Sequence, residues 1–189
     1  MTSNSLFYSR FNFNLASALN HARFFNSYGP GEVPGKYRNV IPNFFYWSIK
    51  KQALPITGTG DETRDFTYVG DIVKGLLAMV YCEDAVGEAF NLAAGREIKI
   101  RDLANWILEL TNNDAGVVFA ERRDWDKKHR LLASIEKARK ILGYNPNMDF
   151  EEGLGQVKKW FDENWDRIEK AQDLKPNQLA KLTNSSGCS

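Results

Sequence analysis

The sequence predicts a small mixed α/β fold in which four or five helices alternate with short strands. Two observations lead to this prediction. Over several stretches of ten or more residues, apolar side chains recur every three or four positions, which is typical of helices that bury one face. Between these stretches lie short runs of β-branched and aromatic residues bounded by glycine or proline, which indicate strands and turns. Hydrophobic residues make up 43% of the chain, which is enough for a packed core.

The first 22 residues are predicted to form a helix, because their apolar side chains share one helical stripe and Asn4 or Ser5 can cap it. The stripe consists of Phe7, Phe11, Leu15, Ala18 and Ala22. A strand is expected over 22–26, and the turn residues Tyr28-Gly29-Pro30-Gly31 end it.

The middle of the chain is predicted to contain two more helices. The first covers 40–51, where Pro42 suits the first turn. An extended segment then ends at the glycine turn 58–60, and a strand follows over 64–69. The next helix covers 70–81, and its apolar positions are Ile72, Val73, Leu76, Leu77 and Val80.

The remaining elements follow from the same patterns. Strands are expected over 88–92, 97–100 and 116–120, with helices over 101–111, 134–142 and 150–168. Ser134 is predicted to cap the helix over 134–142, which ends at Gly143. Asp149 is predicted to cap the last helix, with Glu152 completing a capping box.

Three parts are therefore expected along the chain. Residues 1–22 form an atypical amino-terminal helix, residues 23–170 form one lobe, and residues 171–189 form a disordered tail rich in lysine, asparagine and serine.

Composition excludes several classes of protein. A formal net charge of +1, from 25 Lys+Arg and 24 Asp+Glu, gives no support for nucleic-acid binding. No apolar run is long enough for a membrane helix, and the first residues do not resemble a secretory leader. Two cysteines and two histidines without ligand-like spacing do not indicate a disulfide framework or a metal site. We therefore expect a cytoplasmic chain without a metal, a membrane or a nucleic-acid partner.

Two arginines are candidates for binding phosphate. Arg64 follows the glycine turn, and Arg123 follows the strand over 116–120. The planar guanidinium group suits bidentate contacts with phosphate oxygens, so the two side chains together could clamp a diphosphate. The alternative is that each arginine pairs with a nearby carboxylate, Arg64 with Asp65 or Asp61 and Arg123 with Asp124.

Two asparagines flank the turn at 28–31. The side-chain amides of Asn26 and Asn39 can both donate and accept hydrogen bonds, which suits sugar hydroxyl groups. The alternative is that they stabilise the turn. The aromatic residues at 44–47 could likewise stack on a base, or belong to the core.

Taken together, these segments resemble the extended short-chain dehydrogenase/reductase family, specifically its nucleotide-sugar epimerases, dehydratases and decarboxylases. The resemblance covers roughly residues 22–166. The segments that carry it, in order, are Arg23–Gly31, Asn39–Phe44, Leu54–Gly60, Thr63–Asp71, Phe90–Gly95, Arg122–Asp126 and Ser134–Pro146.

The resemblance implies roles for eight residues. Asn26 matches a residue that contacts the sugar diphosphate, and Asn39 and Val40 match a pair that contacts the hexose and a phosphate. Pro55 and Thr57 stand where backbone groups hold the nucleobase. Arg64 and Arg123 match two diphosphate-binding arginines, and Asp126 matches a carboxylate that binds a ribose hydroxyl. Arg101, which lies on a different predicted helix, is expected to leave this binding unchanged.

The chain also departs from the family pattern. Members of the family bind NAD through a glycine-rich loop and use a Tyr-x-x-x-Lys pair, in which the lysine lowers the tyrosine pKa. Here Tyr8 is followed four residues later by Asn12, which is neutral, and no glycine-rich loop is present. The resemblance therefore implies a substrate-binding lobe that lacks most of the Rossmann cofactor domain and has neither catalytic nor cofactor-binding residues.

Three interpretations remain open. The chain is the substrate lobe of an NAD-dependent enzyme, a separate module that binds a nucleoside diphosphate or nucleotide sugar, or a folded remnant or interaction module that binds neither. We also expect a homo-oligomer or a separate cofactor-domain partner, because a lobe without its cofactor domain should expose apolar surface near Phe24, Phe25 and the stripe over 1–22.

Overall fold

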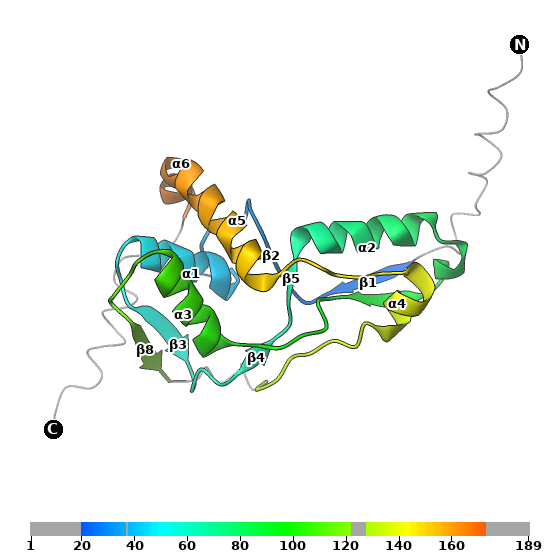
Figure 1. Cartoon of the computed structure of the whole chain (residues 1–189), viewed down its shortest axis with the longest axis horizontal. Helices are drawn as coiled ribbons and strands as arrows, with labels where there is room; N and C mark the ends of the chain where they lie inside the picture. Colours follow the sequence, from blue (N-terminus) through cyan, green and yellow to red (C-terminus); the bar gives the residue numbers. More distant parts are fainter. Residues whose placement is uncertain (1–19, 37, 122–127, 173–189) are drawn as a thin grey trace, which may run out of the picture.

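The computed structural model describes residues 20–36, 38–121 and 128–172. These residues form six α-helices, one short 3₁₀ helix and eight strands along an elongated body (Figure 1). The strands are β1 (His21–Phe24), β2 (Asn26–Tyr28), β3 (Leu54–Thr57), β4 (Thr63–Arg64), β5 (Phe66–Tyr68), β6 (Ala89–Leu92), β7 (Ile98–Lys99) and β8 (Val117–Ala120). The helices are α1 (Val40–Ile49), α2 (Val69–Tyr81), η1 (Glu83–Ala85), α3 (Ile100–Leu110), α4 (Glu136–Leu142), α5 (Phe150–Glu163) and α6 (Trp165–Ala171). The predicted α/β class is confirmed.

The strands pair in four two-stranded sheets. Three of these are parallel and join β1 to β6, β2 to β5 and β3 to β8, whereas β4 and β7 are antiparallel. Parallel pairs need long connections, and the sheets here join segments far apart in the sequence. Asn26, for example, lies opposite Phe66, and Thr57 lies opposite Ala120.

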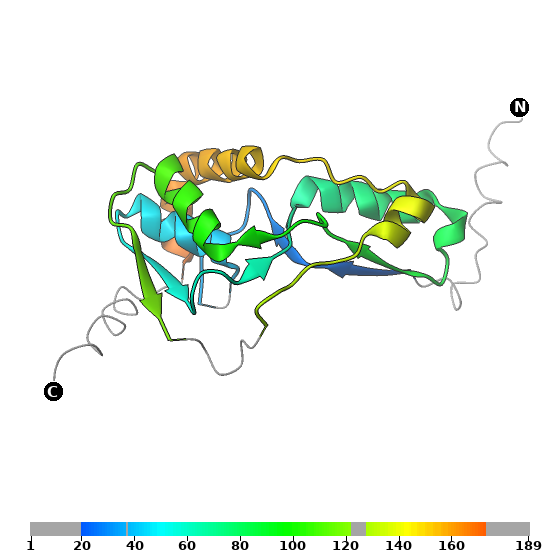
Figure 2. The same ribbon diagram turned by 60° about the horizontal axis from the view of Figure 1, so that its bottom comes forward.

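Two hydrophobic clusters lie at the two ends of the body. The larger one is built from α1, α3, α5 and α6 with β3 and β5, and it includes Phe45, Ile107 and Phe161, each with no exposed surface. The smaller one joins α2 to β6, η1 and α4. Figures 1 and 2 agree that α1, α3, α5 and α6 occupy one end, and that α2 and α4 occupy the other. The aromatic residues Phe44, Phe45 and Tyr46 are buried, which confirms their interpretation as core.

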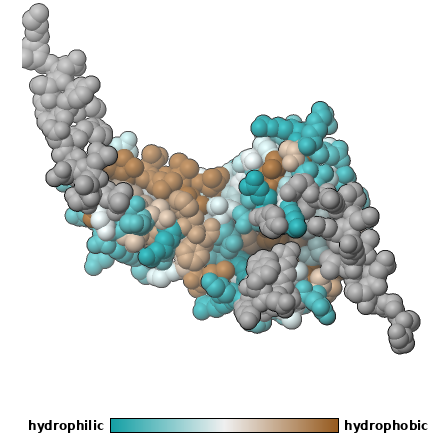
Figure 3. Space-filling view, turned by 180° about the vertical axis from the view of Figure 1, so that it is seen from behind, coloured by the Kyte–Doolittle hydropathy of each residue, from teal (hydrophilic) through white to brown (hydrophobic). Residues whose placement is uncertain are grey.

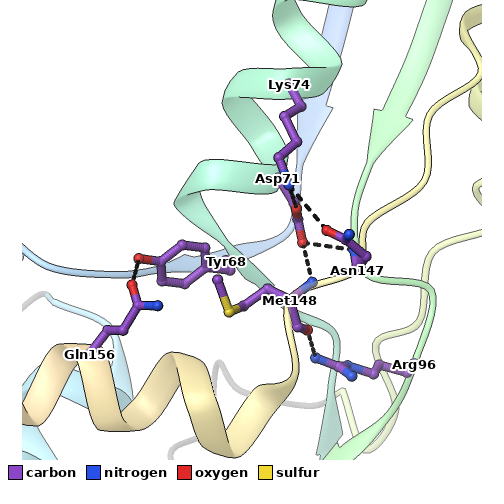
Figure 4. Close-up of polar contacts among 7 residues, drawn as sticks. All are labelled: Tyr68, Asp71, Lys74, Arg96, Asn147, Met148 and Gln156. Atoms are coloured by element: carbon purple, nitrogen blue, oxygen red, sulfur yellow. Dashed lines mark hydrogen bonds and ion pairs between the residues drawn. The ribbon is translucent and has the colours of Figure 1, made fainter.

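A polar network connects the two ends (Figure 4). Asp71, in the first turn of α2, is buried, and its carboxylate accepts hydrogen bonds from the amides of Asn147 and Met148 at 3.1 and 2.9 Å. Its other oxygen lies 2.9 Å from Lys74 Nζ. Arg96 donates to the Met148 carbonyl at 2.6 Å. These bonds fix the connection between α4 and α5 against the start of α2.

Several predicted boundaries are correct. Asp149 caps α5 by accepting hydrogen bonds from the amides of Glu151 and Glu152. Gly143 ends α4 with a left-handed backbone (φ 63°), in which a residue with a side chain is strained. Strand β8 and helix α1 also lie where the sequence placed them.

Other boundaries were wrong. The strand expected over 22–26 is two short strands, β1 and β2, which separate at Phe25 and pair with different partners. Ser134 does not cap α4, since the residue at the cap position is Ile135, and the Ser134 carbonyl instead accepts a hydrogen bond from Asn91. The helix expected over 150–168 is interrupted at Asn164, whose side chain donates to the Trp160 carbonyl.

The predictions for the two ends of the chain lie mostly outside the described residues. Of the helix expected over 1–22, only the last three residues are described, and His21 and Ala22 belong to β1 rather than to a helix. Of the tail expected over 171–189, only Ala171 and Gln172 are described, and Ala171 ends α6. Phe24 is 51% exposed, as expected, and Phe25 is partly buried against the smaller cluster.

Candidate functional site

Strands β2 and β5 bring the first predicted residues together. Asn26 is half-buried at the start of β2 and lies opposite Phe66 of β5. Arg64 lies two residues before Phe66, at the end of β4. Parallel pairing therefore places the Asn26 amide and the Arg64 guanidinium group on neighbouring segments, although they are far apart in the sequence.

Asn39 connects the start of α1 to the same region. It occupies the N-cap position of α1, and its Nδ2 donates to the Ser27 carbonyl at 3.3 Å and to Glu32 Oε1 at 3.1 Å. These bonds confirm that Asn39 stabilises the turn, which was one of the two interpretations. Burial raises the pKa of Glu32, and the bond from Asn39 opposes that rise. Val40 is the first residue of α1, where backbone amides have no partner within the helix.

The loop before Asn39 is held by Asn43, which the sequence analysis did not single out. The Asn43 side chain accepts from the Gly35 amide at 2.8 Å and donates to the Gly35 carbonyl at 3.0 Å. Asn43 is 9% exposed and lies on α1. Its position one turn into a helix that follows a loop was the only signal in the sequence for this role.

Pro55 and Thr57 lie on one face of β3. The alternation of the strand buries Leu54 and Ile56 in the larger cluster and leaves Pro55 and Thr57 half-buried on the opposite face. Strand β8 runs beside them, with Thr57 opposite Ala120, and the Gly58 amide donates to the Ala120 carbonyl at 3.0 Å.

A buried carboxylate shapes the loop that follows β3. Glu62 is 5% exposed, and it accepts hydrogen bonds from the amides of Thr59 and Gly60 at 3.3 and 2.8 Å. Gly58 and Gly60 have positive φ angles of 93° and 84°, which glycine adopts without strain. The glycine turn is evident from the sequence, whereas the role of Glu62, which fixes the path of the chain from Thr57 to Arg64, was not predicted.

Arg64 donates hydrogen bonds to two backbone carbonyl groups. Its Nη1 donates to the carbonyl groups of Thr63 at 2.9 Å and His129 at 3.5 Å. The Asp65 carboxylate accepts instead from backbone amides, and Asp61 lies 3.7 Å from Lys99 Nζ and 3.9 Å from Arg101 Nη2. Both carboxylates named in the alternative interpretation thus have other described partners.

Asp65 links three segments around the site. Its carboxylate accepts hydrogen bonds from the amides of Ala94 at 3.0 Å, Gly95 at 3.1 Å and Ala133 at 3.2 Å. The side chain has no exposed surface. Burial raises the pKa of Asp65, and the hydrogen bonds from the amides oppose this effect. Asp65 thus fixes β4 and β5 relative to the loop after β6 and to the segment before α4.

Arg123, Asp126 and the alternative partner Asp124 lie outside the described residues. The described chain on either side of them does approach the site. On one side, Ala120 lies opposite Thr57. On the other side, the His129 carbonyl accepts from the Thr63 amide at 2.9 Å, and the Leu131 amide donates to the Thr63 carbonyl at 3.1 Å.

An exposed ion pair between Arg130 and Glu97 holds the described segment that follows residue 127. Arg130 Nε and Nη2 donate to the two carboxylate oxygens of Glu97, each at 2.8 Å, and Thr63 Oγ1 donates to Glu97 at 2.7 Å. Hydrogen bonds from Arg130 and Thr63 lower the pKa of Glu97 to about 2. The pair fixes the segment at 128–131 beside β4 and β7.

Arg101 lies much closer to this region than the sequence analysis expected. Its Nη2 donates to the Thr59 carbonyl at 2.7 Å, and its backbone amide donates to the Gly60 carbonyl at 2.9 Å. The guanidinium carbon lies 5.7 Å from the centre of the Phe119 ring. Arg101, on α3, therefore contacts the loop that joins Thr57 to Arg64, and substituting it is not a neutral control for binding.

Two features bear on whether the described residues could hold a metal or a dinucleotide. Within the described ranges, no group of three or more histidine, cysteine, aspartate or glutamate side chains comes together. Helix α2 follows β5 directly, without a glycine-rich loop, and Asp71 occupies its first turn. A carboxylate at that position repels a pyrophosphate, so the start of α2 does not fit the phosphates of NAD.

Residues 12–157 match the protein family described as GDP-mannose 4,6 dehydratase. The chain belongs to this family. Its relatives are NAD-dependent nucleotide-sugar enzymes of the extended short-chain dehydrogenase/reductase family, so the resemblance inferred from the motifs is confirmed.

Two curated relatives of this chain are decarboxylases. The UDP-N-acetyl-alpha-D-glucosaminuronate decarboxylase of Bacillus cytotoxicus is 30% identical over 146 residues, which covers 75% of this chain and 45% of that protein. The UDP-glucuronic acid decarboxylase 2 of Arabidopsis thaliana is 34% identical over 140 residues, which covers 74% of this chain and 31% of that protein.

Solved structures agree with the family assignment. An epimerase of Methanothermobacter thermautotrophicus superposes with a TM-score of 0.82 and is 55% identical, covering 88% of this chain and 50% of that one. The enzyme WbmF of Bordetella bronchiseptica, solved with NAD+ and UDP, superposes with a TM-score of 0.68 at 36% identity. The match covers 79% of this chain and 47% of that one. The chain thus spans half or less of the length of these four relatives. Among the described residues, no helix combines the length and apolar character needed to cross a bilayer.

Proposed function

We propose that this chain binds a nucleoside diphosphate or nucleotide sugar at the region formed by β2, β3, β4 and the start of α1. In this proposal Asn26 contacts the sugar diphosphate, and Asn39 and the Val40 amide hold the sugar and a phosphate. Pro55 and Thr57 hold the nucleobase through backbone groups, and Arg64 binds the diphosphate. Arg123 and Asp126 are proposed to add a second guanidinium group and a carboxylate for the ribose.

The convergence of two strand pairs, β2 with β5 and β3 with β8, supports the proposal most strongly. Asn26 and Arg64 come together through β2 and β5, and Thr57 is connected to Arg64 by the loop that Glu62 and Arg101 fix. Ala120 beside Thr57 and His129 beside Thr63 bring both flanks of the segment with Arg123 to the same region. WbmF, with which this chain superposes, was solved with UDP, so uridine diphosphate is the first ligand to test.

We further propose that this chain alone does not convert the sugar. The family uses a Tyr-x-x-x-Lys pair, and the sequence has Asn12 where the lysine stands relative to Tyr8. A neutral amide does not lower the tyrosine pKa electrostatically. Helix α2 follows the parallel strand β5 directly. Its first turn is acidic and does not suit a dinucleotide phosphate.

The test is a calorimetric titration of the purified chain with uridine diphosphate. We expect a dissociation constant in the high-micromolar to millimolar range, because a charge-assisted hydrogen bond contributes roughly 1.5–3 kcal/mol before the entropic cost of association is subtracted. Arg64→Ala should weaken binding about tenfold, which corresponds to about 1.4 kcal/mol. Arg64→Lys should bind uridine diphosphate with an intermediate affinity, because lysine keeps the positive charge but lacks the planar guanidinium group.

Arg139→Ala is the matched control. Arg139 is an exposed arginine on α4, 3.5 Å from Glu136, and it lies in an element that takes no part in the proposed site. It should leave the affinity unchanged. If uridine diphosphate gives no heat or chemical-shift response at several millimolar, the chain is a folded remnant or interaction module. Formation of an epimerised or decarboxylated sugar after addition of NAD alone would contradict the proposed lack of catalysis.

A further inference from the structure

Glu32 places a carboxylate beside the residues that are proposed to hold the sugar. It lies in the loop between β2 and α1, and its Oε1 accepts a hydrogen bond from Asn39 Nδ2 at 3.1 Å. The same Nδ2 donates to the carbonyl of Ser27, the residue after Asn26, at 3.3 Å. Asn39 therefore connects the carboxylate both to β2 and to the start of α1.

The loop that carries Glu32 is anchored to the rest of the fold. Val33, the next residue, packs against the larger hydrophobic cluster. Gly35 is held by the Asn43 side chain through two hydrogen bonds of 2.8 and 3.0 Å. Glu32 itself is half-buried. Because the chain around it is fixed, the carboxylate can leave this position only by breaking its bond to Asn39.

The groups that this turn offers to a ligand are hydrogen-bond acceptors. A side-chain amide nitrogen carries two hydrogens, and Asn39 uses both, on Ser27 and on Glu32. Its Oδ1 can only accept, and so can the second oxygen of an ionised Glu32. Hydroxyl groups can donate to both oxygens, whereas a carboxylate on the ligand has no hydrogen to donate.

The charge of Glu32 is partly shielded from water. Burial raises the pKa of Glu32, and the hydrogen bonds from Asn39 oppose this rise by favouring the ionised form. The attraction of Arg38 lowers the pKa least of these effects, and Arg38 is exposed. A like charge within about 4–6 Å is disfavoured, and the screening by salt is weaker for partly buried groups than for exposed ones.

We propose that Glu32 determines which sugars the site accepts: it favours a nucleotide sugar whose sugar is uncharged and disfavours one whose sugar carries a carboxylate. This inference rests on the proposed function, because Asn26, Asn39 and Val40 are the proposed contacts of the sugar diphosphate. Without Glu32, the Arg64 guanidinium group and the start of α1 would attract a further negative charge. The proposal separates this chain from the two decarboxylases, whose names refer to uronic acids.

The largest exposed apolar side chains lie elsewhere. Figure 3 shows hydrophobic side chains gathered over the end of the molecule that contains α2, such as Val73 and Leu77. Helix α1, whose N-cap position Asn39 occupies, lies at the other end in Figures 1 and 2. Hydrogen bonding and charge therefore decide the selectivity beside Asn39.

The test is a calorimetric titration of the full chain with uridine diphosphate, UDP-glucose and UDP-glucuronic acid. The two nucleotide sugars differ only at carbon 6, which is a hydroxymethyl group in one and a carboxylate in the other. We expect UDP-glucuronic acid to bind about tenfold more weakly than UDP-glucose, which corresponds to about 1.4 kcal/mol. The measured quantity is the ratio of the two dissociation constants, in which any effect of Glu32 on the shared diphosphate cancels.

Glu32→Gln removes the charge but keeps an oxygen that can accept from Asn39. The ratio should fall to about one or below, because the arginine then attracts the carboxylate of the sugar without opposition. Glu136→Gln is the matched control: its side chain is 79% exposed on α4, and this variant should keep the ratio of the unsubstituted chain. Far-UV circular dichroism should be the same for all three proteins.

Three results would overturn the role of Glu32 alone. The first is an unsubstituted chain that binds UDP-glucuronic acid as tightly as UDP-glucose, or more tightly, a result that needs no variant. The second is a ratio that Glu32→Gln leaves unchanged, which would assign the selectivity to another group. The third is an equal fall of the ratio in Glu136→Gln, which would show an effect of overall charge. If uridine diphosphate itself does not bind, the proposed function and this inference both fail.

Discussion

Replacing Asp65 by alanine is expected to lower the free energy of unfolding by about 3 kcal/mol, because it removes a buried acceptor that three segments share. The carboxylate accepts hydrogen bonds from the amides of Ala94, Gly95 and Ala133. The Ala94 amide keeps a second acceptor in Thr67 Oγ1, at 2.9 Å. The substitution therefore leaves two amides without their acceptor, one buried at Ala133 and one partly exposed at Gly95.

The magnitude follows from these two amides. A buried donor without a partner costs about 1–3 kcal/mol, so the Ala133 amide accounts for about 2 kcal/mol and the partly exposed Gly95 amide for about 1 kcal/mol. Burial raises the pKa of Asp65, which shows that the ionised carboxylate already opposes folding to some extent. Removing the carboxylate recovers part of that cost. The free energy taken for each amide therefore lies in the lower half of the range of about 1–3 kcal/mol. For a chain of this length it corresponds to a fall in Tm of roughly 6–12 °C.

Urea unfolding followed by tryptophan fluorescence measures the effect, with the midpoint compared at constant slope. Asp61→Ala is the matched control, because Asp61 is 60% exposed and its ion pairs, at 3.7 and 3.9 Å, are long. Exposed pairs of this kind contribute about 0–1 kcal/mol. A loss below about 1 kcal/mol for Asp65→Ala, or equal losses for the two variants, would refute the assignment of Asp65 as the link between these segments.

Two further outcomes are expected. Gly153→Ala should destabilise the chain by about 1–3 kcal/mol, because the new Cβ would clash with the Tyr28 hydroxyl and ring. Gly155→Ala, in the same helix with open space around it, should stabilise the chain by about 0.5–1 kcal/mol. Equal shifts in melting temperature for the two variants would contradict this expectation. In an NMR titration Glu97 should have a pKa near 2, and Arg130→Ala should return it toward 4.5. Because this pKa is lowered in the folded chain, the contribution of the Glu97–Arg130 pair to stability is present above pH 4.5 and is lost as the pH falls toward 2. A titration midpoint near 4.5 in the unsubstituted chain would show that the pair is not formed.

The sequence predicted elements well where local chemistry fixes them. Asp149 at the start of α5 and Gly143 after α4 are examples, since a cap or a left-handed residue acts within one turn of the helix. It failed where a tertiary contact or a local bond competes with periodicity. The apolar spacing of α5 continues into α6, so nothing in the pattern predicts the interruption at Asn164. There the backbone leaves the helical conformation (φ −124°, ψ 18°), and the Asn164 side chain donates to the Trp160 carbonyl.

Burial was harder to predict than helix formation. The sequence indicates that α2 is helical, yet it does not show which apolar face meets the core. The structure buries Ile72 and Met79, with Met79 in the smaller cluster, and it leaves Val73 and Leu77 exposed. For the site, the motifs predicted Asn26 and Arg64, but Glu62 and Arg101 were missed, because their roles depend on a loop whose shape only the fold reveals.

The measurement that tests the central claim most directly is a two-dimensional NMR titration of the labelled chain with uridine diphosphate. We expect the backbone amide signals of Asn26, Val40, Thr57 and Arg64 to shift together with a single saturation curve, while that of Leu77 on α2 does not move. Signals that shift only outside this group, or no shift at several millimolar ligand, would contradict the claim that these strands form a nucleotide-binding site.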